Sequence, residues 1–557
     1  MRNINQLPAI SFVLITTLKL LLIPSYKSTD FDVHRNWLAI THHLRLSEWY
    51  FDDGNGTTVH TLDYPPSFAF FEYFLSNNFI TQLLIKRDYL DGRCLELLPD
   101  HDNDVGLDCV IFHRCTVIFA DVIFIMGACA LARSLQDKKH NHLHNQRNLK
   151  LSMMLVMTNS GLFVLDHIHF QYNGMMLGIL LASLACFMQS IKITSQSSRC
   201  MRSRIKFELL GSVLFALLLT FKHLYLTLAP MYFFYLLRRF CFINLEDHLK
   251  IKDGSVGSRK TRSGKKQRVK FSVSRLVLLG SVVLATIFIP FAPFLMDGKD
   301  QMMQILSRLF PFQRGLCHDY WAGNIWAMYL FLEKVCSFLS RTHPILYKVI
   351  PSQFSEISPF IAASVLFIGL LPAMRCAHKS ASNSLLSVET RQDALLYCAV
   401  YSSLTSFMLA YHVHEKAIMT AILPMTYLSF RSKEGARLFL RISAIGHFGL
   451  SPLLFRPQEL LVKALLQCCY LALCIFVLET VHSSKDHKQR NDLLLMCDKI
   501  GIVFMVVVFL YSEVLHGCIF GASYEFLPLM ITSMYCALGL FGCWVNCGII
   551  VYKICDE

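Results

Sequence analysis

Charged residues are scarce in this chain of 557 residues, because Asp, Glu, Lys and Arg together make up only 17% of it. Soluble domains contain about 25% charged residues. Hydrophobic residues make up 54% of the chain, and many of them form long uninterrupted runs. This composition excludes an ordinary soluble domain and predicts a polytopic membrane protein.

Tryptophan is rare, and the cysteines lack the spacing of metal ligands. Five Trp against 43 Phe favour lipid-facing helices over a surface that stacks bases. The 20 cysteines include an adjacent pair, Cys468-Cys469, but no C-x-x-C pattern. Cys94 and Cys109 fall in one extramembrane loop, which allows a disulfide between them. No small-residue cleavage site follows the first apolar run, so we expect that run to stay as a signal anchor.

Fourteen apolar runs approach the length of about 20 residues that a membrane-spanning helix needs. They lie near 8–25, 111–132, 151–167, 173–191, 205–221, 223–240, 275–295, 358–375, 394–411, 416–430, 438–455, 459–480, 499–520 and 526–551. The pairs within 205–240 and 394–430 are each split by a short polar hinge. We see no internal repeat of the kind common in transporters.

Basic residues fall in alternate loops between these runs, which predicts a cytosolic N-terminus by the positive-inside rule. The net charge of +14 therefore indicates membrane loops rather than a nucleic-acid partner. We expect one membrane domain over 1–557, with luminal loops at 26–110 and 296–357 and a basic cytosolic loop at 246–272. Composition favours a solvated role for the basic loop over binding to anionic lipid headgroups. The luminal loop 26–110 is rich in acid and contains the glycosylation sequon Asn55-Gly56-Thr57.

Five polar groups fall on the predicted luminal face, at span ends or in loops. They are Asp30-Phe31-Asp32-Val33-His34-Arg35-Asn36-Trp37 with Asp63-Tyr64-Pro65-Pro66; Asp166 to Asn173, which includes His167, His169 and Gln171; Phe221-Lys222-His223; Arg308 with Phe310 to Trp321, which includes Arg314 and His318; and His412-Val413-His414-Glu415-Lys416. Ionisable residues that gather at one membrane face are typical of a functional site.

Asp30 and Asp63 are the strongest candidates among these groups. An acidic pair after a helix is often only solvated loop. Here, Pro65-Pro66 forces an extended backbone at Tyr64 and allows a helix to start at Ser67, so Asp63 is held in place. This favours a site role for the region around both carboxylates.

Two roles are possible for the histidines of these groups, and two for the cations. His-x-His occurs at His167/His169 and at His412/His414, but residues two apart do not share a helical face. Hydrogen-bonding or phosphate-facing histidines are therefore favoured over a metal site. Four luminal cations either snorkel to the headgroups or clamp a lipid phosphate, namely Lys222, Arg308, Arg314 and Lys416.

Two classes of function fit this pattern. A transporter or flippase of lipid-linked sugars needs ionisable groups near the middle of the membrane and usually repeats. An enzyme acting on a lipid-phosphate substrate needs a carboxylate base outside the bilayer and cations for the leaving phosphate. The charges of this chain lie at one face, which favours the enzyme.

Nearly the whole chain resembles the endoplasmic-reticulum glucosyltransferases that use dolichyl phosphate glucose and have the GT-C membrane fold. The resemblance is carried, in order, by residues 29–37, 62–66, 167–173 and 412–416. Two runs are similar to the branch that adds the second glucose: Arg314-Gly315-Leu316-Cys317-His318-Asp319-Tyr320-Trp321-Ala322-Gly323-Asn324-Ile325-Trp326-Ala327 and Phe221-Lys222-His223-Leu224-Tyr225-Leu226. The branch that adds the first glucose is the alternative. Asp32 and Gly323 depart from the family's pattern, where we expect Glu and Pro.

The resemblance implies an all-α membrane fold of about fourteen spans, with short helices in its luminal loops and the active site facing the lumen of the endoplasmic reticulum. It implies an inverting α-1,3 transfer of glucose, without a cofactor or metal, to the monoglucosylated nine-mannose oligosaccharide on dolichyl diphosphate, a late step before protein N-glycosylation. Asp30 is then the catalytic base. The expected substrate-binding residues are Asp32, His34, Arg35, Asp63, His167, His169, Gln171, Lys222, His223, Arg308, Arg314, His318, His414, Glu415 and Lys416.

Overall fold

The computed structural model describes residues 2–51, 60–97, 105–136, 142–193, 197–244, 269–296, 298–317, 321–342, 353–383, 385–483 and 493–556. Within these ranges the chain is helical apart from one hairpin, in which β1 (Phe242–Asn244) pairs antiparallel with β2 (Val269–Phe271). The two strands are a small departure from the all-α expectation. They bring the two ends of the basic segment together just before α12, and residues 246–268 of that segment lie outside the described ranges.

The first half of the chain alternates long helices with short ones. After α1 (Arg2–Leu21) come the short helices α2 (Thr29–His43), η1 (Leu46–Glu48), α3 (Pro66–Asn77), α4 (Phe79–Lys86) and η2 (Gly92–Leu95). The bundle continues with α5 (Leu107–Ser134), α6 (His142–Met157), α7 (Ser160–Leu162), the π-helix η4 (Phe163–Ile168), α8 (Asn173–Lys192), α9 (Ser198–Phe221), η5 (His223–Leu228), α10 (Ala229–Leu236) and η6 (Leu237–Cys241).

The second half begins with α12 (Val273–Met296), followed by α13 (Lys299–Leu309), η7 (Phe312–Arg314) and α14 (Ile325–Thr342). The remaining elements are α15 (Pro359–Ser382), α16 (Val388–Leu409), η9 (Glu415–Ile418), α17 (Met419–Leu428), α18 (Lys433–Phe448), η10 (Ser451–Leu453), η11 (Pro457–Glu459), α19 (Leu460–His482), α20 (Met496–Leu510), η12 (Tyr511–Leu515), α21 (His516–Phe520) and α22 (Leu527–Asp556).

Eight helical segments of the described chain are long and apolar enough to cross a membrane. They are Leu107–Ser134, Asn145–Ile168, Asn173–Lys192, Val273–Met296, Pro359–Ala381, Pro457–His482, Met496–Phe520 and Leu527–Asp556, and Ile10–Leu21 is a shorter apolar helix. The other expected spans also fall on helices, which are shorter or more polar. The run 223–240, for example, is divided among η5, α10 and η6. The fold is thus that of a helical membrane protein.

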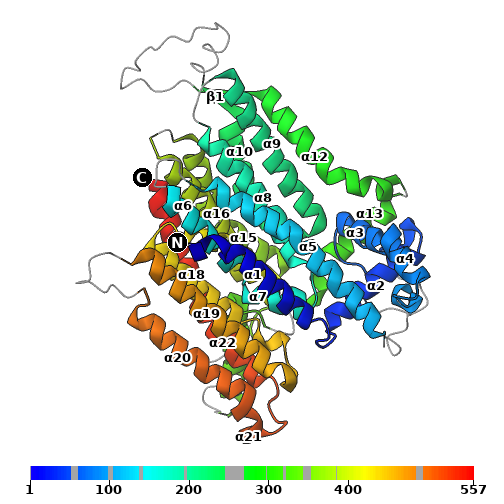
Figure 1. Cartoon of the computed structure of the whole chain (residues 1–557). Helices are drawn as coiled ribbons and strands as arrows, with labels where there is room; N and C mark the ends of the chain where they lie inside the picture. Colours follow the sequence, from blue (N-terminus) through cyan, green and yellow to red (C-terminus); the bar gives the residue numbers. More distant parts are fainter. Residues whose placement is uncertain are drawn as a thin grey trace.

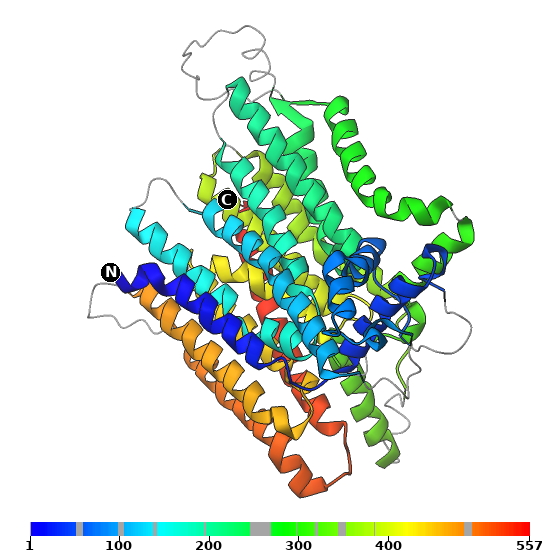
Figure 2. The same cartoon turned by 45° about the vertical axis from the view of Figure 1, so that its right-hand side comes forward.

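The helices form one bundle whose two ends differ (Figure 1). In both views α2, α3, α4 and α13 gather at one end, whereas the β hairpin and the two termini lie toward the other (Figures 1 and 2). Every residue from Ala394 to Leu409 is buried, so α16 lies at the centre of the bundle. Most of α12 and α20 is exposed, as expected for helices that face lipid.

Two local features fix the end of the bundle that carries α2. A disulfide joins Cys94 of η2 to Cys109 in the first turns of α5, so the bond that the sequence allowed is present. Further along, α5 and α8 approach so closely that a Cβ at Gly127 would overlap the carbonyl oxygen of Gly178. Small residues allow this backbone contact between neighbouring helices. The N-terminus of α8 is thereby held beside α5.

Candidate active site

Asp30 lies in the first turn of α2, and its position is fixed by the cap of that helix. Ser28 is the N-cap residue, and its Oγ accepts a hydrogen bond from the backbone N–H of Phe31 (3.3 Å). The same hydroxyl donates to the carbonyl oxygen of His169. The start of α2 is therefore tied to the segment between η4 and α8.

That segment turns sharply at Phe170, whose φ of +80° is unusual for a residue with a side chain. On either side of the turn, His169 Nε2 lies 3.1 Å from Asp30 Oδ2, and Gln171 Nε2 donates to the same oxygen at 2.5 Å. Two residues that a helix would separate thus reach one carboxylate. The strained backbone at Phe170 places both donors.

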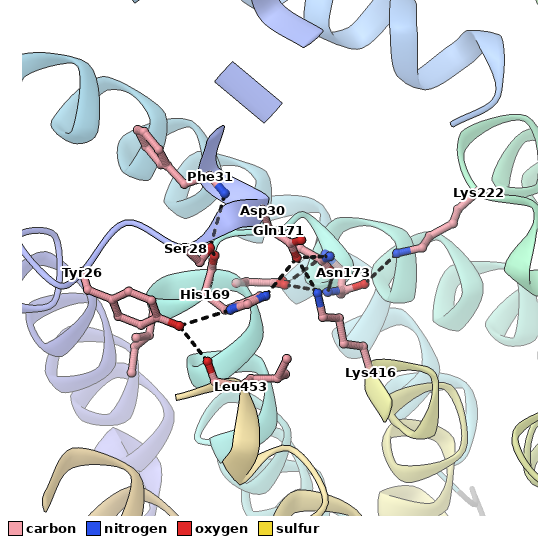
Figure 3. A network of polar contacts seen from close by, with 12 residues as sticks. Tyr26, Ser28, Asp30, Phe31, His169, Gln171, Asn173, Lys222, Lys416 and Leu453 are labelled. Atoms are coloured by element: carbon pink, nitrogen blue, oxygen red, sulfur yellow. Dashed lines mark hydrogen bonds and ion pairs between the residues drawn. The ribbon is translucent and has the colours of Figure 1, made fainter. Parts of the chain in front are cut away.

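Lys416 supplies the third contact to Asp30. It lies in η9, nearly 400 residues further along the chain, and its Nζ forms an ion pair with Asp30 Oδ2 (Figure 3). All three contacts therefore go to Oδ2. Among the described residues, Oδ1 of Asp30 makes no hydrogen bond, so it is the oxygen left to accept a proton.

A second chain of contacts leads from Gln171 to Lys222. Gln171 Oε1 accepts a hydrogen bond from Asn173 Nδ2 (2.7 Å), and Asn173 Oδ1 accepts one from Lys222 Nζ (3.1 Å). The ammonium group of Lys222 also lies 4.8 Å from the centre of the Tyr64 ring. Asp166 fixes Asn173, because its Oδ1 accepts hydrogen bonds from Nδ2 and from the backbone N–H of Asn173 (3.0 and 3.1 Å). Lys222 is thus placed beside Asp30 through amide side chains.

Asp63 lies at the same end of the bundle, in electrostatic contact with Asp30 and Lys222. Its Oδ2 is 3.5 Å from Nη1 of Arg314, a side chain that is 50% exposed. Pro65 is the N-cap of α3 and has an extended backbone, and α3 begins at Pro66, one residue before the predicted Ser67. The two carboxylates therefore share one cluster, but they have different cation partners.

The pKa values of the two carboxylates in the cluster differ sharply. Burial alone would raise the pKa of Asp30, but Lys416 and His169 outweigh it and hold this pKa well below the usual range. Burial raises the pKa of Asp63 to about 6, because Arg314 offsets it only in part. Burial, together with repulsion from Lys416, lowers the pKa of Lys222 to about 8. At neutral pH the cluster therefore contains an ionised Asp30 beside two ammonium groups.

Several predicted site residues point away from Asp30. His34 is buried and lies 3.0 Å from Glu72, with aromatic rings around it. Arg35 donates to the carbonyl oxygen of Glu96 (2.8 Å), and Asp32 lies in electrostatic contact with Lys27 and Arg35. These contacts hold together the segment between α1 and α5.

His167 also points away, although it is two residues from His169. Its Nε2 lies 3.1 Å from Asp121 Oδ2, which also forms an ion pair with Lys19 at 2.5 Å. The two histidines of this His-x-His run therefore have separate partners: His167 contacts Asp121 inside the bundle, and His169 contacts Asp30 at the site.

The other predicted residues surround the cluster. Arg308 Nη1 donates to Thr61 Oγ1 (3.0 Å). The ring of His223 lies against Phe310. The buried Nδ1 of His223 has no hydrogen-bond partner in the described part of the chain. His414 contacts the ring of His412, whereas Glu415 is buried beside Lys416. His318 lies outside the described residues, as does the Asn55 sequon.

Sequence reasoning missed Arg114, which is buried inside a predicted span. Its guanidinium donates to three backbone carbonyls: those of His167, Ile168 (2.8 Å) and Tyr26 (3.1 Å). It therefore joins the segment before α2 to the segment that holds His169. A charge within the run 111–132 was the available signal, because buried charges in membrane helices are seldom without a role.

One group of described residues has the close spacing of metal ligands, Cys94, Cys109 and His113. Its two cysteines form the disulfide, so their thiolates are not available to a metal.

Comparison with known proteins gives consistent matches over the full chain. The profile of the ALG6, ALG8 glycosyltransferase family matches residues 15–547. The protein named dolichyl pyrophosphate Glc1Man9GlcNAc2 alpha-1,3-glucosyltransferase in Bos taurus is 34% identical over 551 residues, which cover 96% of this chain and 93% of the relative. Proteins of the same name are 35% identical in Mus musculus (96% and 93% covered) and 33% identical in Arabidopsis thaliana (96% of both).

Replacing Arg114 tests whether it organises the site. We expect Arg114→Gln to lower the midpoint of thermal unfolding in detergent, because each buried carbonyl left without a donor costs about 1–3 kcal/mol. Arg375→Gln is the matched control, since that side chain is 62% exposed. Equal midpoints for the two variants would contradict this role.

Proposed function

The chain belongs to the ALG6, ALG8 glycosyltransferase family, and on this premise we propose that it transfers glucose in α-1,3 linkage to Glc1Man9GlcNAc2 on dolichyl pyrophosphate. The observation that carries the proposal is the match to relatives of this one activity along 96% of the chain. Their names specify an acceptor that already has one glucose, which favours this reaction over addition of the first glucose or transport of a lipid-linked sugar.

The donor we propose is dolichyl phosphate glucose, the donor implied by the family resemblance. A lipid-linked phosphate carries negative charge next to the bond that breaks, so its site needs cations at the membrane surface. Lys222, Lys416 and Arg314 gather around Asp30 and Asp63. His223 follows Lys222 in the sequence, and its buried Nδ1 has no hydrogen-bond partner among the described residues.

Asp30 acts as the base in a single displacement with inversion. Its Oδ1 takes the proton from the 3-hydroxyl of the terminal glucose of the acceptor. The oxygen of that hydroxyl forms the new bond to C1 of the donor glucose, while the bond from C1 to the phosphate oxygen breaks. Dolichyl phosphate leaves with the bonding electrons, and the nearby cations stabilise its charge.

Lys416 connects donor binding to the activation of this base. Without donor, its ammonium group neutralises Asp30, which keeps the pKa of the carboxyl low and its basicity weak. A donor phosphate offers Lys416 a competing anion. As Lys416 turns toward the phosphate, the pKa of Asp30 rises and the carboxylate becomes a better base. Asp30 is then activated only when the donor is in place.

The proposed location is the membrane of the endoplasmic reticulum, crossed fourteen times, with the site facing the lumen. The positive-inside pattern of the loops supports this orientation. The disulfide between Cys94 and Cys109 lies at the site's end of the bundle, and disulfides persist in oxidising compartments such as this lumen.

The activity is tested by glucose transfer with purified protein in detergent, using dolichyl phosphate glucose and lipid-linked acceptors that carry no glucose or one. We expect transfer to the monoglucosylated acceptor alone. Preference for the acceptor without glucose would indicate the first-glucose reaction. A transporter would yield no product with either acceptor.

Replacing Asp30 tests the base. We expect Asp30→Asn to lower the turnover number by at least about a hundredfold, because the amide cannot take the proton. The midpoint of thermal unfolding serves as the measure of folding, and Asp300→Asn is the control, since Asp300 is exposed in α13 at the same end of the bundle. Turnover within tenfold of the wild type would rule out Asp30 as the base.

Replacing Lys222 tests the donor site. If Lys222 binds the donor phosphate, Lys222→Ala raises the KM for dolichyl phosphate glucose by about tenfold or more and changes the KM for the acceptor little. Lys86→Ala is the control, because Lys86 is exposed at the end of α4. Equal losses for donor and acceptor would argue against phosphate binding by Lys222.

A further inference from the structure

Four arginines and one buried glutamate lie together at the end of the bundle away from Asp30. Glu208 of α9 is fully buried, and its Oε1 lies 3.6 Å from Nε of Arg204 and 3.3 Å from Nε of Arg239. Arg275 of α12 is in electrostatic contact with Arg204 and Glu208, and it donates to the carbonyl oxygen of Phe240 (3.1 Å). Arg391 of α16 is in electrostatic contact with Arg239 and Tyr235 and completes the group, which we call the arginine cluster.

The arginine cluster has more positive charge than Glu208 can balance. The cluster contains four guanidinium groups and a single carboxylate, so its net charge is about +3 when all five are ionised. Arg391 is repelled by Arg239, and burial together with this repulsion lowers its pKa. A half-buried excess of cations is unfavourable unless an anion accompanies it.

Several buried polar atoms in the cluster lack hydrogen-bond partners in the described part of the chain, including Oε2 of Glu208 itself. Tyr235 is 1% exposed, and its hydroxyl has no partner among the described residues, nor has Nε of Arg391. The hydroxyl of Tyr235 lies among the charges of the cluster, because it interacts electrostatically with Arg204, Arg239, Arg391 and Glu208. Buried polar atoms in proteins are normally paired. Within the described ranges, the donors of Tyr235, Arg239 and Arg391 that lack a hydrogen bond outnumber the one such acceptor, Oε2 of Glu208, which indicates that the cluster lacks an anionic acceptor.

The arginine cluster is separate from the candidate active site. Arg239 also donates to the carbonyl oxygen of Ser190 (3.0 Å), near the C-terminal end of α8. Asn173, at the start of α8, belongs to the network of Asp30. Seventeen residues of helix separate the two, or about 25 Å at 1.5 Å per residue. A ligand at the cluster therefore does not touch the reacting groups.

We propose that Arg204, Arg239, Arg275, Arg391 and the Tyr235 hydroxyl form a binding site for a phosphate group, the headgroup phosphate of an anionic membrane lipid or a free phosphate. Guanidinium groups bind phosphate oxygens through paired hydrogen bonds, which the excess charge of the cluster strengthens. The hydroxyl of Tyr235 donates one further hydrogen bond to the same group.

A lipid is the favoured source of this phosphate because the cluster borders a surface that faces lipid. Val273, Val277 and Leu278, on either side of Arg275 in α12, are 63%, 59% and 45% exposed. Acyl chains would lie along this apolar face while the headgroup reaches the arginines. By the proposed topology the cluster faces the cytosol, where anionic lipids are abundant.

The test uses the purified full-length protein in a neutral detergent, with dioleoyl phosphatidic acid, dioleoyl phosphatidylcholine or inorganic phosphate as probes. Native mass spectrometry counts bound lipid, and the midpoint of thermal unfolding reports stabilisation by the ligand. We expect phosphatidic acid to bind and to raise the midpoint, and phosphatidylcholine to do neither. If inorganic phosphate displaces phosphatidic acid and raises the midpoint, the natural ligand is a free phosphate; if it does neither, the ligand is a lipid.

Variants separate ligand binding from a purely structural role. We expect Arg391→Gln to weaken binding of phosphatidic acid by about tenfold and Tyr235→Phe by about threefold. Arg375→Gln removes the same charge from an exposed position and leaves the affinity unchanged. Without ligand, Arg391→Gln keeps or raises the unfolding midpoint, because it removes repulsion from Arg239.

Two results would overturn the proposal. One is equal binding of phosphatidic acid and phosphatidylcholine, which would indicate general solvation by lipid. The other is wild-type affinity for phosphatidic acid in both Arg391→Gln and Tyr235→Phe. The transfer assay distinguishes failure of this site from failure of the proposed enzyme activity, since the cluster is remote from Asp30.

Discussion

The ion pair between Asp30 and Lys416 is the contact on which the site depends. A largely buried carboxylate such as that of Asp30, which is 22% exposed, is costly at the end of a membrane bundle unless a cation compensates for it. Lys416 provides this charge from η9, and His169 and Gln171 add hydrogen bonds to the same oxygen. One carboxylate thus connects three segments that are far apart in sequence. The close contact between α5 and α8 and the three carbonyls held by Arg114 keep those segments in register.

We propose that the same ion pair also controls the reaction. A base that stays neutralised until its partner is drawn away does not act on water or on an acceptor alone. The donor phosphate is the natural competitor for Lys416, because it brings a second anion to a cluster that already contains Lys222. Asp63 has a different partner in Arg314 and a pKa of about 6, so the two carboxylates are not equivalent. We assign proton transfer to Asp30 and a supporting role to Asp63.

Much of this arrangement could be predicted from the sequence, because topology places polar span ends on one face. Asp30, Asp63, His169, Gln171, Lys222 and Lys416 do come together. The direction of each side chain could not be predicted. His34 and His167 turn inward to Glu72 and Asp121, and only the backbone at Phe170 explains why His169 does not follow. Arg114 was missed because its run reads as an ordinary span.

The measurement that tests the central claim most directly is the structure of the Asp30→Asn protein with dolichyl phosphate glucose and the monoglucosylated acceptor bound. If Asp30 is the base, the acceptor's 3-hydroxyl lies about 3 Å from the side chain of residue 30 in that structure, and Lys416 is turned toward the donor phosphate. An acceptor hydroxyl placed against Asp63, with residue 30 remote from it, would contradict the assignment of the base.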